Sequence, residues 1–584
     1  MFLLSLLFAS APAHALNPPG EVIEDAAIVD ITPGGFEAIK LIADQLIPSS
    51  IPLPGIYEYD IERPCVNIPI IGTQCITVYE YELDVSNFEA SLEIATLDIL
   101  PRPDRLDLVI DVTAQINSAA NPGRIDAFAR AIEIINITQS CEVYTNPITL
   151  GVTTSILPQL VQGPDGPRII VGIAPISLDF DVGTFLRIEG SNCILSALTD
   201  VLDFIGVDVI GFLVDLARPL VEDAINDFIP EIEALLEDAL GAIRFEVTLD
   251  LGGASLSILV EPSQLLIDDR GLRIGLSGAV DPGPTPADCV LPYAPEAGSE
   301  ATGTRSPELG DGPQFVDHHL GVFVDDDFVN QILYGVWYGG LLCVELGGEG
   351  GGGGLDFDLP IPLDTAIFNL LAPGGFEGLF TPNRPIRIVT RPVNPPRAFV
   401  DGAYDVGLEV ADLGLDIYAE LDGRLTRAVG VSLDVDVGVD LRFSGSTGEL
   451  SADLAFSPDA FSFSVPYNEL DPAASDTVAN GLANLVGTIV GPLIGGLGDS
   501  LGFALPSFEG LGLTTLLVRE AGPDRDRIGL FANIGLVDYE STGDGCDGGC
   551  DAGCSSGGLG GGAALPGLIA GLALLRRRRI DVEA

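Results

Sequence analysis

The chain has 584 residues, of which 47% are hydrophobic and 19% are charged, and its formal net charge is −58. Such an excess of acidic residues repels nucleic acid and anionic membrane surfaces, so nucleic-acid binding is disfavoured. The length predicts two to four domains, and the hydrophobic fraction is enough to form their cores.

Residues 1–15, MFLLSLLFASAPAHA, have the pattern of an export signal. An apolar run ends in Ala13-His14-Ala15, the small-x-small spacing that signal peptidase cleaves. The basic residues that usually start such a signal are missing, and a buried strand or helix is the alternative. We expect the mature protein to begin near Leu16 and to be exported.

A first domain is predicted over residues 16–280. Near its start, Phe36, Ile39 and Leu46 fall at helical spacing, which predicts a helix over 32–47. Prolines that follow this run should end the helix.

A long helix is predicted over residues 193–240 of the same domain. Apolar residues recur at every fourth position in its later part, which places them on one helical face. Pro219 and Pro230 should kink or split this helix, because proline removes a backbone donor. Alternating apolar and polar residues predict strands before it, within 79–182, and after it, within 244–280.

A second domain is predicted over residues 315–540, after a linker at 281–314 that is rich in proline, glycine, serine and threonine. This domain repeats the order of the first: a helix, many strands, a second helical segment over 475–502, and final strands. The clearest strand is VSLDVDVGVDLRF at 431–443, where apolar and polar residues alternate. The chain thus has two regions of similar predicted architecture without obvious sequence identity.

The helix that opens the second domain lies in VDDDFVNQILYGVWYGGLLCVEL, residues 324–346. The aspartates at its start can cap free N–H groups and face the positive end of the helix dipole. Phe328, Ile332 and Val336 line one edge of its apolar stripe, and Trp337 lies on the adjoining edge. A broad apolar face of this kind docks on a sheet.

Six of the nine cysteines lie in the body of the chain, and an even number in an exported protein predicts disulfide bonds. Many pairings are possible for six cysteines. The simplest set is Cys65–Cys75, which flanks an expected hairpin, together with Cys141–Cys193 and Cys289–Cys343.

The segment 541–584 combines a Cys/Gly linker, an uncharged stretch at 559–575 and an arginine cluster. As a helix, the uncharged stretch would span roughly 25 Å, just short of a bilayer core. This order resembles the carboxyl-terminal sorting signals of myxobacteria and related Gram-negative bacteria, which implies removal of the tail and delivery to the cell surface. A plain tail anchor is the alternative. The expected signal residues are Cys546, Cys550, Cys554, Arg576, Arg577, Arg578 and Arg579.

The order of elements over residues 32–540 resembles the two-domain lipid-binding family of BPI, lipopolysaccharide-binding protein and cholesteryl ester transfer protein, the TULIP superfamily. The segment FVDDDFVNQILYGVWYGGLLCVEL is similar to the helix that opens that family's second barrel. Cys141 and Cys193 are similar to its strand-to-helix disulfide. The resemblance implies an α+β fold of two tandem TULIP-like barrels, each a highly curved antiparallel sheet wrapped around a long helix. The family's cationic tip has no counterpart in this sequence, so endotoxin recognition is not carried over.

The resemblance also implies binding of a lipid or another amphipathic molecule in apolar pockets, without covalent chemistry or a cofactor, in association with the outer membrane or cell surface. Each buried CH₂ contributes about 0.8 kcal/mol, so burial of acyl chains would supply binding energy in such pockets. Alternatively, the helices complete dry cores, as in a β-rich structural or adhesive surface protein. The pocket candidates are Phe36, Ile39, Leu46, Phe328, Ile332, Val336 and Trp337. The sequence predicts no oligomeric state.

Patterns for catalysis or metal binding are weak. GDSLG at 498–502 matches G-x-S-x-G, but it ends a helical segment and no histidine follows Ser500. We interpret it as a helix-ending turn. The tail cysteines lack a nearby fourth zinc ligand. We therefore expect no enzyme activity and no resident metal.

Overall fold

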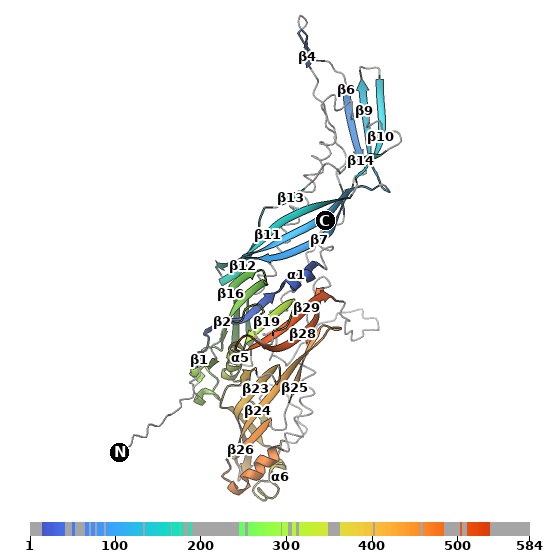
Figure 1. Ribbon diagram of the computed structural model, residues 1–584. Coiled ribbons are helices and arrows are strands. Elements are labelled where there is room, and N and C mark those ends of the chain that lie inside the picture. Colours follow the sequence, from blue (N-terminus) through green and yellow to red (C-terminus); the bar gives the residue numbers. More distant parts are fainter. Residues whose placement is uncertain are drawn as a thin grey trace, which may run out of the picture. The chain divides into compact units, whose positions relative to one another are not determined.

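The computed structural model describes residues 15–40, 50–52, 65–68, 72–75, 79–86, 89–118, 120–131, 135–145, 147–164, 166–175, 177–179, 186–189, 244–250, 255–293, 295–301, 306–310, 315–347, 363–400, 403–455, 460–483, 503–504 and 511–537 (Figure 1). The chain divides into two compact units. Unit 1 comprises residues 1–35, 159–170 and 239–584, and unit 2 comprises residues 36–158 and 171–238.

Unit 2 is built from antiparallel sheets. A six-stranded sheet, most of which lies in this unit, has the order β12-β11-β8-β7-β3, with β13 paired to β11. A four-stranded sheet has the order β14-β10-β9-β6. The strands are β3 (Ser50–Pro52), β6 (Tyr79–Ser86), β7 (Glu89–Arg102), β8 (Arg105–Ile116), β9 (Gly123–Ala131), β10 (Ile135–Thr145), β11 (Ile148–Gly163), β12 (Gly166–Ile173), β13 (Ser177–Asp179) and β14 (Leu186–Glu189).

One face of the six-stranded sheet is a core. Leu106, Leu108 and Ile110 of β8 are buried, as are Val152 and Ile156 on the neighbouring strand β11. Alternate residues of a strand point to the same face, so the alternation seen in the sequence places these side chains together.

Unit 1 contains a seven-stranded antiparallel sheet, the central sheet, with the order β15-β16-β17-β2-β19-β29-β28. Its strands are β2 (Val22–Ile31), β15 (Phe245–Asp250), β16 (Ser255–Asp268), β17 (Gly271–Asp281), β19 (Leu320–Asp325), β28 (Leu511–Ala521) and β29 (Arg527–Leu536). The sheet combines strands from both sides of the segment 281–314. The domain boundaries proposed from the sequence remain a prediction.

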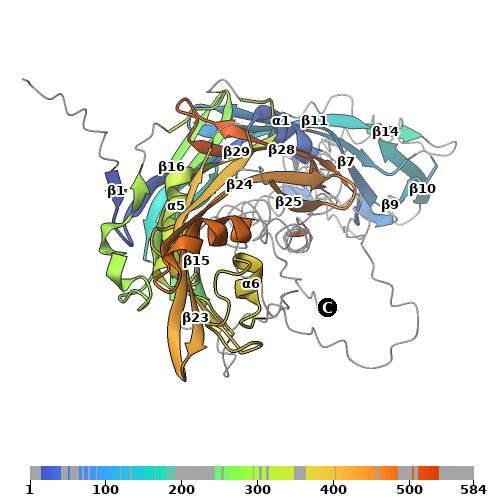
Figure 2. The same cartoon turned by 90° about the horizontal axis from the view of Figure 1, so that it is seen from below.

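Unit 1 also contains an eight-stranded sheet with the order β20-β21-β23-β24-β25-β27, in which β22 pairs with β23 and β26 with β24. The strands are β20 (Glu345–Gly347), β21 (Arg387–Pro392), β22 (Arg397–Phe399), β23 (Val406–Leu421), β24 (Arg424–Ser444), β25 (Glu449–Ala455), β26 (Phe461–Tyr467) and β27 (Phe503–Ala504). Register shifts interrupt the pairing of β23 with β24 and of β24 with β26. Such bulges bend strands, and these long strands are visibly curved (Figure 2).

The inner side of the eight-stranded sheet is covered by short helical pieces. Helix α6 (Ile367–Leu371) and the helical residues 475–483 pack with strand residues such as Ile417 and Val429 in one buried cluster (Figure 2). The shorter helical turns of unit 1 are η3 (Leu291–Tyr293), η4 (Pro295–Ala297) and η5 (Pro472–Ala474), and its small strand pair is β1 (Ala15–Asn17) with β18 (Ser299–Ala301).

The predicted fold class is confirmed: curved antiparallel half-barrel sheets dominate and helices are few. The helices of the described residues are short, since α1 spans Pro33–Ile39 and α5 spans Asp326–Tyr338. The long helix predicted over 193–240 lies outside the described residues, and so does most of the one predicted over 475–502.

Candidate functional site

Helix α5 begins where the run of aspartates predicted. Asp325 is the N-cap, and its Oδ1 accepts a hydrogen bond from the backbone N–H of Asp327 at 3.0 Å. The Arg527 guanidinium of β29 lies 2.7 Å from the other carboxylate oxygen of Asp325, and both side chains are buried. The cap and the buried ion pair together fix the start of α5 on the central sheet.

The start of α5 concentrates negative charge. Burial raises the pKa of Asp325 to about 6, although Arg527 lowers it, and the nearby Asp327 and Asp526 raise it further. Asp325, Asp326 and Asp327 each offer a ligand atom, and these atoms lie within 4.8 Å of one another. A hard cation could fit such a set of oxygens, although no metal site was predicted from the sequence. Arg527 already supplies a compensating positive charge there.

One side of α5 packs on the central sheet. Phe328, 4% exposed, lies against Gly278, where an added Cβ would come 2.5 Å from its ring. Gln331 accepts a hydrogen bond from the N–H of Val280 at 2.9 Å and donates one to the carbonyl of Glu21 at 2.8 Å. Phe328 is therefore a core residue.

A second side of α5 faces strands β21 and β22. The side chain of Asn330 makes two hydrogen bonds with the backbone of Ala398, donating at 3.1 Å and accepting at 2.7 Å. Trp337 is 2% exposed, and its Nε1 donates to the carbonyl of Pro392 at 2.9 Å. A buried tryptophan needs such a partner for its N–H, so Trp337 fills the core and ties α5 to the second sheet.

The segment predicted as a linker packs against the end of α5. Val290 is buried in one cluster with Tyr334, Trp337 and Tyr338. The disulfide Cys289–Cys343, the pairing expected for these two cysteines, joins the segment to the chain just after α5, with 6.3 Å between the Cα atoms.

A third side of α5 is entirely aliphatic. Val329, Ile332, Leu333 and Val336 follow the i, i+3, i+4, i+7 spacing of one helical face. Val329 is buried, whereas Ile332, Leu333 and Val336 are only half-buried. The candidates Phe328, Ile332, Val336 and Trp337 thus lie on different sides of one helix, and only Ile332 and Val336 keep accessible surface.

The remaining pocket candidates lie elsewhere. Phe36 is buried in α1. The side chain of Ile39 and the whole of Leu46 lie outside the described residues.

The expected hairpin at Cys65 is present. Strands β4 (Cys65–Ile68) and β5 (Gly72–Cys75) pair so that Cys65 and Cys75 are opposite each other. Cys141 lies in β10, but the side chains of all three cysteines are outside what the structure describes.

Several other predicted residues also lie outside the described part of the chain: Cys193, Ser500, Cys546, Cys550, Cys554 and Arg576 to Arg579. Within the described ranges, no helix is both long enough and apolar enough to cross a membrane. The sorting signal and its apolar segment therefore remain a prediction.

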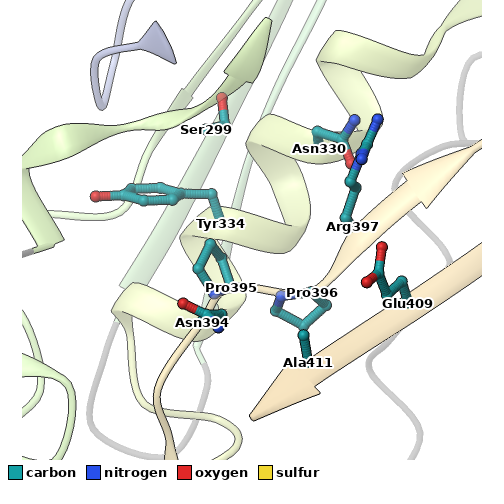
Figure 3. A pocket seen from close by; sticks show the side chains of 9 residues that line it. All are labelled: Ser299, Asn330, Tyr334, Asn394, Pro395, Pro396, Arg397, Glu409 and Ala411. Atoms are coloured by element: carbon teal, nitrogen blue, oxygen red, sulfur yellow. The ribbon is translucent and has the colours of Figure 1, made fainter. Parts of the chain in front are cut away.

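A pocket of about 250 Å³ lies between α5 and the β22–β23 strand pair, next to β18 (Figure 3). It is lined by Ser299, Asn330, Tyr334, Asn394, Pro395, Pro396, Arg397, Glu409 and Ala411. This pocket was not predicted from the sequence, where only the Asn-Pro-Pro-Arg run at 394–397 indicates a rigid wall.

No family model and no curated protein matches this chain. Among solved structures, it is similar to a lipopolysaccharide binding protein, with 15% identity over 88% of this chain and 100% of that one and a TM-score of 0.48. It is also similar to P47 of Clostridium botulinum E1, with 9% identity over 88% and 100% of the two chains and a TM-score of 0.22. Takeout 1 of Epiphyas postvittana shows 13% identity over 30% of this chain and 78% of that one, with a TM-score of 0.16. The fold is assigned from the sheets and helices of this chain alone.

Proposed function

We propose that this protein binds the acyl chains of a lipid or another amphipathic molecule along the aliphatic side of α5. The observation that carries the proposal is the half-burial of Ile332, Leu333 and Val336 on a helix whose other two sides are packed. Removing such surface from water is favourable by about 25 cal/mol per Å².

A hydrocarbon chain is the chemistry that this surface fits. The side chains on it have no hydrogen-bonding group, and a polar ligand placed there would lose its hydration without compensation. Binding would use burial alone, with no covalent step and no cofactor.

We further propose that the protein is exported and associates with the cell surface. The Ala13-His14-Ala15 pattern supports export. The disulfide Cys289–Cys343 also supports it, because disulfides persist in oxidising compartments.

The test is native mass spectrometry of the full chain, purified under oxidising conditions without detergent, followed by lipid extraction. We expect stoichiometric lipid on the wild type and its loss in Ile332→Glu and Val336→Glu, since a charge cannot be buried against an acyl chain. Leu425→Glu is the matched control, because Leu425 is 55% exposed at the β23–β24 turn. The comparison requires that each variant has the same midpoint temperature of unfolding as the wild type, so that loss of lipid does not come from loss of the fold.

A folded protein that is empty as purified, and stays empty when offered phospholipid or lipopolysaccharide, would contradict the proposal. That outcome favours a β-rich structural or adhesive surface protein, for which the solid packing of Phe328 and Trp337 is the supporting observation.

A further inference from the structure

His318 is buried in a cluster of aromatic rings just before β19, away from the aliphatic side of α5. It is 5% exposed. Its ring centre lies close to those of three phenylalanines: Phe315 at 5.0 Å, Phe531 at 5.2 Å and Phe323 at 6.2 Å. Gly321 leaves room for the imidazole, because an added Cβ there would come 2.6 Å from Nε2 of His318. The central sheet thus buries a titratable ring among apolar ones.

The contacts of His318 favour a neutral ring. Its Nδ1 lies 2.8 Å from the carbonyl oxygen of Val316. A carbonyl only accepts, so Nδ1 carries the proton and Nε2 keeps its lone pair. Nε2 is buried and has no hydrogen-bond partner in the part of the chain that the structure describes. Burial therefore lowers the pKa of His318 from its ordinary value of 6.5, although the bond to Val316 raises it.

The charged groups nearest to His318 do not compensate an imidazolium. On its own segment, Asp317 raises the pKa of His318 but is exposed to solvent, and the adjacent His319 lowers it. Asp30 of β2 is opposite Gly321 in the register. Burial raises the pKa of Asp30 to about 7, so this carboxyl is mostly neutral at the acidic pH where His318 would take up its proton.

The strands around the ring cluster supply no better partner among the described residues. Two of their carboxylates are already in ion pairs: Asp325 of β19 with Arg527 of β29 at 2.7 Å, and Glu520 of β28 with Arg525 at 3.5 Å. Arg273 of β17, opposite Asp30, and Arg519 of β28, two residues before Ala521 of the cluster, are cations. A positive charge on His318 would therefore be buried without a counter-ion, which is costly.

We propose that protonation of His318 frees residues 315–318 from the central sheet and exposes the rings of Phe323 and Phe531. An imidazolium regains its hydration when it leaves the cluster. Phe315 leaves with it, since its ring packs edge-on against Phe531 at 5.7 Å between ring centres. The acid form of the protein then presents an aromatic surface that the neutral form hides.

The opening stops at the start of β19. The N–H of His319 donates to the carbonyl of Ala532 at 2.9 Å, so the strand itself stays paired. The change is therefore a local opening and not an unfolding of the sheet. This inference does not depend on the acyl-chain proposal, because it concerns different side chains.

The pH dependence of the opening has a definite sign. The pKa of His318 is lowered in the closed state and returns to about 6.5 when the segment opens. His318 therefore leaves the opening equilibrium unchanged well above pH 6.5 and favours the open state as the pH falls below it, by up to about tenfold for each pH unit. Asp30 acts in the opposite direction if the opening exposes it, so the test compares proteins that differ only at His318.

Hydrogen exchange of the full chain, followed by mass spectrometry at pH 7.5 and pH 5, measures the opening of residues 315–324. After correction for intrinsic exchange rates, the ratio of the opening constants of the wild type and of His318→Phe should rise between pH 7.5 and pH 5, by up to about thirtyfold. His318→Leu, which also removes the titrating group, should give the same result. The matched control His319→Gln should keep the pH dependence of the wild type. A ratio that is equal at the two pH values would overturn the proposal.

NMR of protein labelled with ¹³C at histidine Cε1 gives a second measurement, because the chain has three histidines and the two variants assign the signals of His318 and His319. The signal of His318 should titrate below pH 6.5. Fluorescence of the dye ANS, which binds exposed apolar surface, should rise over the same range in the wild type and not in His318→Phe. Titration of His318 at or above pH 6.5, or an equal rise of dye fluorescence in the variant, would contradict the proposal.

Discussion

At the scale of the residue, Asp30 of β2 is a buried acid in the central sheet. It is 2% exposed, and burial raises its pKa to about 7, while Arg273, directly opposite on β17, and Arg270 lower it. The folded state therefore holds this proton more tightly than the unfolded chain does. The resulting stability is fully present below about pH 4 and is lost as the pH rises through about 7.

We predict that Asp30→Asn changes the pH dependence of stability. Relative to this variant, the wild type should lose about 4 kcal/mol of unfolding free energy between pH 4 and pH 8, since each pKa unit is worth about 1.4 kcal/mol. Urea unfolding of both proteins at pH 4.5, 6 and 8 measures the difference. Parallel profiles would show that Asp30 does not titrate in this range.

Asp416 of β23 illustrates a buried charge network. Its two carboxylate oxygens lie 2.7 Å from Arg391 Nε and 2.6 Å from Arg427 Nη2. The guanidinium of Arg427 also lies 4.1 Å from the centre of the Tyr467 ring. Asp416 itself is buried, so its charge depends on these two partners.

We predict that Asp416→Asn destabilises the protein by about 3–5 kcal/mol, because it leaves two partly buried arginines without their counter-charge. Asp453→Asn is the control, since Asp453 pairs with Arg442 on the surface and such pairs contribute about 1 kcal/mol or less. Urea unfolding at pH 7 compares the two. Equal losses would mean that burial of the network does not matter.

At the scale of the element, α5 was the best predicted helix. The aspartate run indicated its start, because local capping chemistry is readable from a few consecutive residues. The sequence did not show which of its apolar residues are packed in the core and which remain accessible. Phe328 and Ile332 share an edge by spacing, yet the first packs against Gly278 and the second is half-buried. The spacing of apolar residues predicts the apolar face of a helix, whereas the neighbouring elements decide which residues of that face are buried.

The segment 281–314 is a second case in which the local sequence did not predict which residues are buried. Its composition predicts a linker, which stays a prediction, and in the structure Val290 is fully buried and Cys289 is bonded to Cys343 across 54 positions of sequence. Closing a loop of that length contributes about 4 kcal/mol in the chain-entropy model.

We therefore predict that the double variant Cys289→Ser, Cys343→Ser loses about 2–4 kcal/mol of unfolding free energy under non-reducing conditions. Either single variant should lose a similar amount, since each breaks the same bond. Thermal unfolding of the three variants beside the wild type provides the measurement. An unchanged midpoint in the double variant would show that the bond does not constrain the unfolded chain.

At the scale of the whole molecule, the central sheet of unit 1 combines strands from both sides of the segment 281–314. Strand β2 pairs with β17 on one side and with β19 on the other, so that Ile31 lies between Leu272 and Leu320. Alternation predicted the strands within 244–280, whereas β2 and β19 were not predicted as strands. The class of curved antiparallel sheets was implied by the family resemblance. The pairing was not predicted, because alternation is satisfied by any neighbour that buries the same face.

The sequence by itself determined the acidic character, many of the strands, and the start of α5. These follow from periodicity, capping and composition, which are properties of short stretches of chain. Only the tertiary structure decided that Phe328 and Trp337 fill the core, that Ile332 and Val336 keep accessible surface, and that Ser299, Arg397 and Glu409 meet around one pocket. Those outcomes depend on contacts between segments far apart in the chain, which no local pattern specifies.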